Sequence, residues 1–419
     1  MDVRENVDYI ENDSMPKLSG YVEVIKYESS YILFNKINGC IVLFEAKHIL
    51  KKLDTYYIYD AKDTELEYLK ENQFFADELV IQKYISENLS LPTIQKKVDI
   101  VISVTEKCNL ACKYCYQLDW EKCDSISDEE YISSIKQYLE KILPDMYTNH
   151  STLSIYYIGG EPLLKSDLIV QITDMIQKMI GGRIPVRYNL DSNSVFLSRE
   201  FILHFPNLQI CTTLTPSDDH NNLRTFSYDS VSSKINEVKD LFDNKQYSLV
   251  IRYNVHHDNI RGIDTILDEL EKMNFNWKFE TQNVTNTPNA VFYNELSEEE
   301  YQQIYLDEIV PIMIRHGLNP QLLPEHTLSR HCRGISPFDI KFYSNGHVTL
   351  CDAFPKKDSQ TDIPKLPPLP DMCIKCLDFP YCGGPKPCDK ELCNGEYRYK
   401  GNAIERIKHY VKNMKREIK

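Results

Sequence analysis

Three cysteines within eight residues constrain this chain more than any other feature. Cys108, Cys112 and Cys115 form the pattern CxxxCxxC in the segment TEKCNLACKYCYQL, directly after the apolar run 98–104. A structural zinc site usually takes four protein ligands, whereas a cubic iron–sulfur cluster can be held by three thiolates with one iron left open. The spacing therefore favours an iron–sulfur cluster, and a zinc site or three buried thiols are the alternatives.

The composition excludes several classes of protein. The chain has 419 residues, of which 42% are hydrophobic and 26% charged, as in a folded protein of one to three domains. Its thirteen cysteines, without an apolar signal segment or a long apolar run, predict metal binding in the reducing cytoplasm and no membrane association. The formal net charge of −14 argues against nonspecific nucleic-acid binding.

Strand-like runs alternate with helical stretches from residue 97 onward. This alternation predicts an α/β fold in which a parallel sheet has its helices outside. The expected strands are 98–104, 153–158, 184–190, 208–214, 247–255 and 277–280, and the expected helices are 127–143, 166–180, 230–244, 262–273 and 298–316, with a kink at Pro311 and an end at Gly317.

The two ends of the chain differ from this middle part. Residues 1–95 predict a small α+β domain with a hairpin turn at Asn38-Gly39. Seven cysteines lie between residues 332 and 393, and an amphipathic helix is expected from about residue 403. Within 1–95 the expected strands are 21–27, 30–36 and 40–44, and the expected helices are 46–53 and 75–86.

A second motif follows the strand-like run 153–158. Gly159 and Gly160 would let the backbone approach a ligand closely, and Glu161 supplies a carboxylate for a cation. On its own GGEP, which ends at Pro162, could be a plain turn. Because it stands one strand–helix unit after CxxxCxxC, the two motifs support each other.

CxxxCxxC with Tyr114 before its last cysteine, followed by GGEP, resembles the radical S-adenosylmethionine (SAM) enzymes. The resemblance implies a partial (β/α)6 barrel in which Cys108, Cys112 and Cys115 hold a 4Fe-4S cluster whose open iron binds SAM. In that family the reduced cluster cleaves SAM to a 5′-deoxyadenosyl radical, so a reducing electron donor such as flavodoxin or ferredoxin is expected.

The resemblance also suggests contacts to SAM. Ser192 and Asn193 lie where the family often has a TNG-type sequence, with Ser194 in place of the glycine, and His220 and Arg224 resemble part of an HDxxR segment. For each of the polar candidates outside GGEP, a surface or core position is the alternative. The expected SAM-contacting residues are Tyr114, Gly159, Gly160, Glu161, Pro162, Ser192, Asn193 and Arg252.

The cysteine-rich tail resembles the SPASM extension of radical SAM enzymes, which binds two auxiliary 4Fe-4S clusters. Five residues (GGPKP) separate Cys382 from Cys388, where the family commonly has three. Zinc binding by the tail is the alternative. Asp352, after Cys351, matches a substrate base of anaerobic sulfatase maturases, or it caps a strand end. The resemblance assigns Cys332, Cys351 and Cys388 to an inner cluster and Cys373, Cys376, Cys382 and Cys393 to an outer one.

Together these features predict three domains, which comprise residues 1–95, 96–317 and 318–419. The first is a candidate for leader-peptide recognition or a packing extension, the second the radical SAM barrel, and the third the SPASM domain. The predicted function is oxidative modification of a ribosomally synthesised precursor peptide to a thioether or carbon–carbon crosslink. The alternatives are a sulfatase maturase that forms formylglycine and a noncatalytic zinc or iron–sulfur peptide-binding protein.

Overall fold

The computed structural model divides into two compact units. The terminal unit contains Met1–Pro92, Gln321–Cys332 and Leu366–Lys419, and the sheet unit contains Thr93–Pro320 and Arg333–Lys365. The terminal unit therefore joins segments from both ends of the chain. The structure describes residues 15–88, 97–115, 117, 126–224, 228–284, 295–320, 339–349, 371–379 and 400–417.

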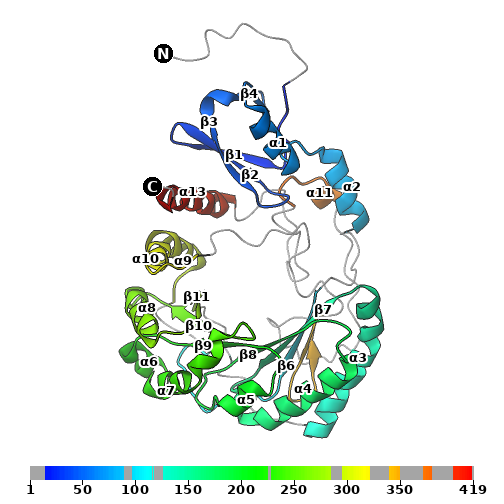
Figure 1. The fold of residues 1–419 in the computed structure, drawn as a ribbon, viewed down its shortest axis with the longest axis vertical. Helices are drawn as coiled ribbons and strands as arrows, with labels where there is room; N and C mark the ends of the chain where they lie inside the picture. The colour runs from blue at the N-terminus through cyan, green and yellow to red at the C-terminus, as the bar shows by residue number, and fades with distance from the viewer. Residues whose placement is uncertain are drawn as a thin grey trace. The chain divides into compact units, whose positions relative to one another are not determined.

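An eight-stranded sheet forms the centre of the sheet unit (Figure 1). Its first six strands are parallel and lie side by side in chain order, which confirms the predicted parallel α/β sheet. These strands are β6 (Lys97–Ser103), β7 (Thr152–Ile158), β8 (Val186–Asp191), β9 (Leu208–Thr213), β10 (Tyr247–Val255) and β11 (Lys278–Asn283).

A short hairpin extends the sheet beyond β6. β12 (Ile340–Phe342) runs parallel to β6 and antiparallel to β13 (Val348–Thr349). The Asp339 carboxylate accepts a hydrogen bond of 2.8 Å from the Asp99 backbone amide and so fixes the start of β12. The sequence did not predict this hairpin, because strands of three and two residues show no periodicity.

Helices cover one face of the sheet, as Figure 1 shows. Alternate strand residues on that face, such as Ile100, Ile155 and Leu249, are fully buried in the main core. The hydroxyl of Ser127 and the carboxylate of Glu130 form a capping box at the start of the first helix. The helices are α3 (Asp128–Thr148), α4 (Ser166–Ile180), α5 (Arg199–Leu203), α6 (Ser217–Leu223), α7 (Tyr228–Val238) and α8 (Gly262–Met273).

The opposite face of the sheet is polar over β8 to β11. Parallel sheets normally carry apolar residues on both faces, because helices cover both. Here the positions that alternate with the core carry partly exposed polar side chains, among them Asn189, Asp191, Gln209, Arg252 and Glu280.

The long helix expected at 298–316 is divided into three parts. α9 (Glu298–Ile304) continues through a π-helical turn (Tyr305–Ile309) into α10 (Val310–Arg315). Pro311 lacks an amide hydrogen and its ring crowds the carbonyl four residues earlier, so the irregularity lies in the turn before the proline. Gly317, with φ of 67°, ends the helix as predicted.

In the terminal unit, β1 (Val22–Tyr27), β2 (Ser30–Asn35) and β3 (Ile41–Glu45) form an antiparallel sheet, followed by α1 (Asp63–Glu71) and α2 (Glu78–Asn88). The predicted helix at 46–53 is wrong. A single 3-10 turn leads instead into β4 (Ile49–Lys52), which pairs with β5 (Thr55–Ile58). Cross-strand pairing of Ile49 with Ile58 outweighs the weak helical preference of this lysine-containing run.

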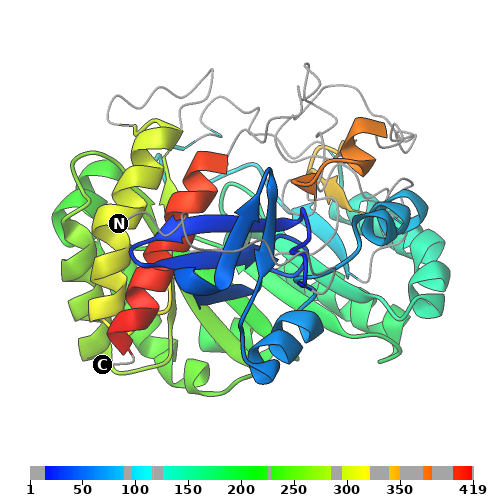
Figure 2. The same cartoon turned by 90° about the horizontal axis from the view of Figure 1, so that it is seen from above.

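The tail segments pack on the N-terminal elements of the same unit. In α13 (Lys400–Glu417), Ile407 and Val411 pack against Ile32 and Phe34 of β2, and Figure 2 shows this helix lying across the first strands. α11 (Asp371–Ile374) contributes Cys373 to a small cluster with Ile85 of α2. No described helix is long and apolar enough to span a bilayer.

Candidate functional site

The three cysteines lie on the loop that follows β6, at the carboxyl end of the parallel strands. The Cys115 amide donates to the Cys112 carbonyl at 3.0 Å, and the Leu110 amide donates to the Cys108 sulfur at 3.4 Å. The Lys113 amide donates to the Leu223 carbonyl at the end of α6, also at 3.0 Å. All three cysteines are partly exposed, and the loop that carries them is a hydrogen-bonded turn.

The GGEP turn packs directly on this cysteine loop. The Gly160 amide donates to the Thr105 carbonyl and the Glu161 amide to the Lys107 carbonyl, both at 2.9 Å. A Cβ atom at Gly159 would lie 2.3 Å from the Thr105 oxygen, and one at Gly160 would lie 2.4 Å from the Lys107 oxygen. The two glycines therefore allow the backbones of two loops to approach each other. The sequence had predicted that they allow a ligand to approach.

Glu161 joins the turn after β7 to the turn after β8. Its carboxylate is fully buried and accepts hydrogen bonds from the Ser192 hydroxyl at 2.7 Å, the Asn193 amide at 2.7 Å and the Leu163 amide at 3.0 Å. Burial raises the pKa of Glu161, and these donors oppose that shift. Pro162 starts the 3-10 turn that leads into α4.

Asn193 completes the connection back to the cysteines. Its side-chain amide donates to the Asn109 side-chain oxygen at 2.7 Å, one residue after Cys108. Ser194 has φ of 64°, the left-handed conformation that glycine adopts most easily, at the position where the TNG-type sequence has glycine. The structure thus brings GGEP, Ser192 and Asn193 together around the cysteine loop.

Tyr114 and Arg252 lie on different parts of the same sheet end. Burial raises the pKa of Tyr114 to about 12, and its hydroxyl is hydrogen bonded to the Asn254 side chain of β10. Arg252, on the polar face, donates to Glu280 at 2.6 Å and to Asp191 at 3.3 Å. The positive charge of Arg252 is therefore already matched by two carboxylates.

Arg224 is a site residue that the sequence indicates only weakly. Its side chain is buried at the end of α6 beside the Cys112 thiol, and one guanidinium nitrogen donates to the Thr213 carbonyl at 2.9 Å. Burial raises the pKa of Cys112, whereas the charge of Arg224 and a hydrogen bond from it lower that pKa. The only sequence signal was the HDxxR-like order of His220 and Arg224.

The donor set fits an iron–sulfur cluster better than one zinc ion. Tetrahedral zinc with bonds of about 2.3 Å needs sulfur atoms about 3.8 Å apart. Cys108, Cys112 and Cys115, all described, do not form a group whose sulfur atoms all lie within 4.8 Å of one another. Three thiols spread around a loop with a positive charge beside one of them suit a larger, anionic cluster.

The tail is described only in part. Cys373 is buried on α11, and the Cys376 amide donates to its carbonyl at 3.2 Å, as in a CxxC turn. The remaining residues predicted for the auxiliary clusters and the substrate base lie outside the described residues: Cys332, Cys351, Asp352, Cys382, Cys388 and Cys393.

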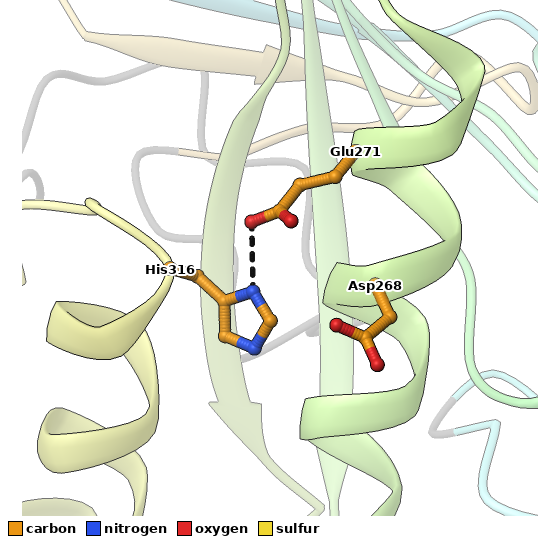
Figure 3. A group of neighbouring side chains, drawn as sticks. All are labelled: Asp268, Glu271 and His316. Atoms are coloured by element: carbon orange, nitrogen blue, oxygen red, sulfur yellow. Dashed lines mark hydrogen bonds and ion pairs between the residues drawn. The ribbon is translucent and has the colours of Figure 1, made fainter.

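Among the described residues, one group of side chains could place three ligand atoms around a metal ion: Asp268, Glu271 and His316 (Figure 3). His316 Nδ1 is 2.8 Å from the Glu271 carboxylate, and its Nε2 is 2.9 Å from the Asp264 carboxylate. Arg315 adds a further ion pair to Asp264 at 2.8 Å. The group is therefore an ion-paired surface cluster whose imidazole is already occupied on both nitrogens.

Comparison with known proteins agrees with the site. No family model matches the chain. The radical SAM cyclopropyl synthase TigE of Paramaledivibacter caminithermalis is 25% identical over 266 residues, which cover 55% of each protein. An S-adenosylmethionine-dependent nucleotide dehydratase of Fibrobacter sp. is 26% identical over 196 residues, covering 44% of this chain and 55% of that protein. The chain thus spans about half the length of these curated relatives.

The fold is similar to that of a solved structure. The structure of anSMEcpe with bound AdoMet superposes with a TM-score of 0.53 at 15% identity, covering 76% of this chain and 98% of that one. The same protein with AdoMet and the Cp18Cys peptide gives a TM-score of 0.51. This chain is therefore similar in sequence to radical SAM enzymes, and its sheet has the fold of anSMEcpe.

Proposed function

We propose that this chain is a radical SAM maturase that oxidatively modifies a ribosomally synthesised peptide by forming a thioether or carbon–carbon crosslink. The observation that carries the proposal is the convergence of three segments at one end of the sheet. The cysteine loop, the GGEP turn and the Ser192-Asn193 turn are connected by backbone and side-chain hydrogen bonds. In such a site the side chains are fixed in position before a ligand binds.

Each part of the chain has a defined task in this function. Cys108, Cys112 and Cys115 would hold a 4Fe-4S cluster, which when bound supplies the electron that cleaves SAM to a 5′-deoxyadenosyl radical. Glu161 positions Ser192 and Asn193 beside the cysteine loop. The polar sheet face over β8 to β11 provides hydrogen-bonding groups for a peptide backbone.

The relatives support a peptide as the substrate. The anSMEcpe structure contains a bound peptide, and that protein shares the sheet fold. We extend the proposal to an N-terminal domain that recognises the leader of the precursor peptide, to two auxiliary 4Fe-4S clusters in residues 318–419, and to Asp352 as the base. A flavodoxin or ferredoxin would deliver the electrons.

The test is iron content and SAM cleavage of anaerobically reconstituted protein, with a Cys108/Cys112/Cys115→Ala variant as control. Three 4Fe-4S clusters predict about twelve irons in the wild type and about eight in the variant. We expect 5′-deoxyadenosine only from the wild type after reduction. Equal iron content in both proteins, or no SAM cleavage, would contradict the radical SAM function.

The substrate is tested separately with peptides. Mass loss of two hydrogens per crosslink in a candidate precursor peptide supports the crosslinking reaction, whereas formylglycine in a Cys- or Ser-containing sulfatase peptide would replace it with the sulfatase-maturase reaction. Deletion of residues 1–95 is unsuitable for this comparison. It would expose Ile407 and Val411 of α13, which pack on β2.

A further inference from the structure

A buried arginine stands beside one of the three cluster cysteines. Arg224 follows α6 directly, and its side chain and backbone are only 6% exposed. Its amide donates to the His220 carbonyl at 2.9 Å, and the preceding residue, Leu223, accepts from the Lys113 amide at 3.0 Å. The end of α6 is therefore attached by its backbone to the middle of the CxxxCxxC loop.

The guanidinium group is held but not neutralised by an ion pair among the described residues. One nitrogen donates to the Thr213 carbonyl at 2.9 Å, and Nε has no hydrogen-bond partner in the described part of the chain. The side chain donates a hydrogen bond to the Cys112 sulfur. An unpaired buried cation is costly unless an anion stands near it.

Two other basic side chains at this end of the sheet do not duplicate this charge. Burial, and then Arg224 itself, lower the pKa of His220 to about 4, so this histidine is neutral near pH 7. Arg252, the other arginine of the sheet end, donates to both Asp191 and Glu280. Neither His220 nor Arg252 therefore places a free positive charge beside Cys112.

We propose that Arg224 is a positioning residue that holds the Cys112 sulfur and, through its charge, makes the bound cluster easier to reduce. The proposal rests on the radical SAM function proposed above. Cluster reduction potentials depend on net charge and on hydrogen bonds to the ligating sulfurs. Because reduction adds a negative charge, a fixed positive charge beside one thiolate favours the reduced form.

The test is a redox titration of the full-length reconstituted protein without SAM, followed by electron paramagnetic resonance. The spectrum of the Cys108/Cys112/Cys115→Ala variant is subtracted to isolate this cluster from any others. In Arg224→Gln we expect the reduced-to-oxidised ratio at the wild-type midpoint to fall tenfold or more, which is about 59 mV for a one-electron couple. Arg224→Lys keeps the charge and should stay within about threefold of wild type.

Arg183→Gln is the matched control, because the Arg183 guanidinium lies 3.9 Å from the Tyr147 ring centre, away from the cysteines, and donates to backbone carbonyls. It should titrate with the wild type. Arg224→Gln that keeps its iron and titrates with the wild type would overturn the proposal.

Iron content separates the remaining outcomes. If Arg224→Gln loses this cluster, recovery of iron in Arg224→Lys supports the role of the charge, and equal loss in both variants overturns it. If the wild type itself holds no more iron than the triple cysteine variant, the radical SAM function fails first and this proposal falls with it.

Discussion

Two clusters of polar side chains in the sheet unit differ in how their hydrogen bonds are used. On α8 and after α10, each nitrogen of His316 meets a carboxylate, and Asp264 also meets Arg315. Around the cysteine loop, Arg224 Nε, the Asn109 amide nitrogen and the Ser194 hydroxyl are buried without partners among the described residues. In the first cluster the side chains pair with one another. In the second, buried donors have no partner among the described residues and could bind a ligand.

This difference in hydrogen bonding distinguishes a stabilising cluster from a functional site better than the types of residue do. Folded proteins rarely bury a polar atom without a partner, so several such atoms in one place indicate a site whose ligand completes them. The spacing of possible ligand atoms alone would select the surface cluster of Asp268, Glu271 and His316. The burial and unmet hydrogen bonds instead point to the cysteine loop.

The largest effect should come from Gly160→Ala. The new Cβ would lie 2.4 Å from the Lys107 oxygen, so the turn and the cysteine loop must separate. Overpacking of this kind costs about 1–3 kcal/mol, and here the strain falls on the cluster loop. We expect the iron of the SAM-binding cluster and SAM affinity to fall tenfold or more, as measured by iron assay and equilibrium binding.

Gly182→Ala is the control for this variant. Gly182 has φ of 76° and no atom within 4 Å of a new Cβ, so the substitution strains only a surface turn. Its iron content and SAM binding should equal those of the wild type despite a loss of about 1 kcal/mol in stability. Equal effects of the two substitutions on iron content would show that the packing of the two loops is unimportant.

A smaller effect, of opposite sign, is expected for Ser194→Gly. Glycine relieves the left-handed backbone at φ of 64° and removes a buried hydroxyl that has no partner among the described residues. We expect a gain of up to about 1 kcal/mol in the free energy of unfolding, measured with urea. A clear loss would mean that the Ser194 hydroxyl has a partner in the working protein.

The smallest effect should come from His316→Gln, and it should depend on pH. Burial lowers the pKa of His316, but hydrogen bonds to Asp264 and Glu271 outweigh it and raise the pKa above the ordinary 6.5. Since the folded-state pKa is the higher one, the stabilisation is complete below pH 6.5 and is lost as the pH rises through the raised value.

The variant should therefore be less stable than the wild type at pH 6, by about 0.5 kcal/mol because the carboxylates are half exposed, and equally stable at pH 9. Urea unfolding at both pH values measures this. A difference that persists unchanged at pH 9 would mean that packing, and not charge, is responsible.

The sequence predicted the large regular elements well. α8 was expected at 262–273 and is observed as Gly262–Met273, because its apolar spacing is strong and its end is marked. β4 was mistaken for helix and the β12–β13 hairpin was not predicted. Both involve short strands that form because they pair with another strand, β4 with β5 and β12 with β6. The local sequence pattern of a short strand does not reveal this pairing.

The site was predictable in its residues but not in its contacts. CxxxCxxC and GGEP identified the two loops that lie together, since motif spacing reflects chain order. The role of the glycines toward Thr105 and Lys107 depends on two backbones meeting in space. The position of Arg224 beside Cys112 depends on where α6 ends, so neither could be read from spacing alone.

The packing of α13 on β2 also sets an order of events during synthesis. Ile407 and Val411, which cover Ile32 and Phe34, are made more than 370 residues later. Domains usually fold from the N-terminal end as they emerge. Here β2 must wait with apolar surface exposed until α13 has been made, so the rate of elongation between them and the chaperone supply should control the yield of folded protein.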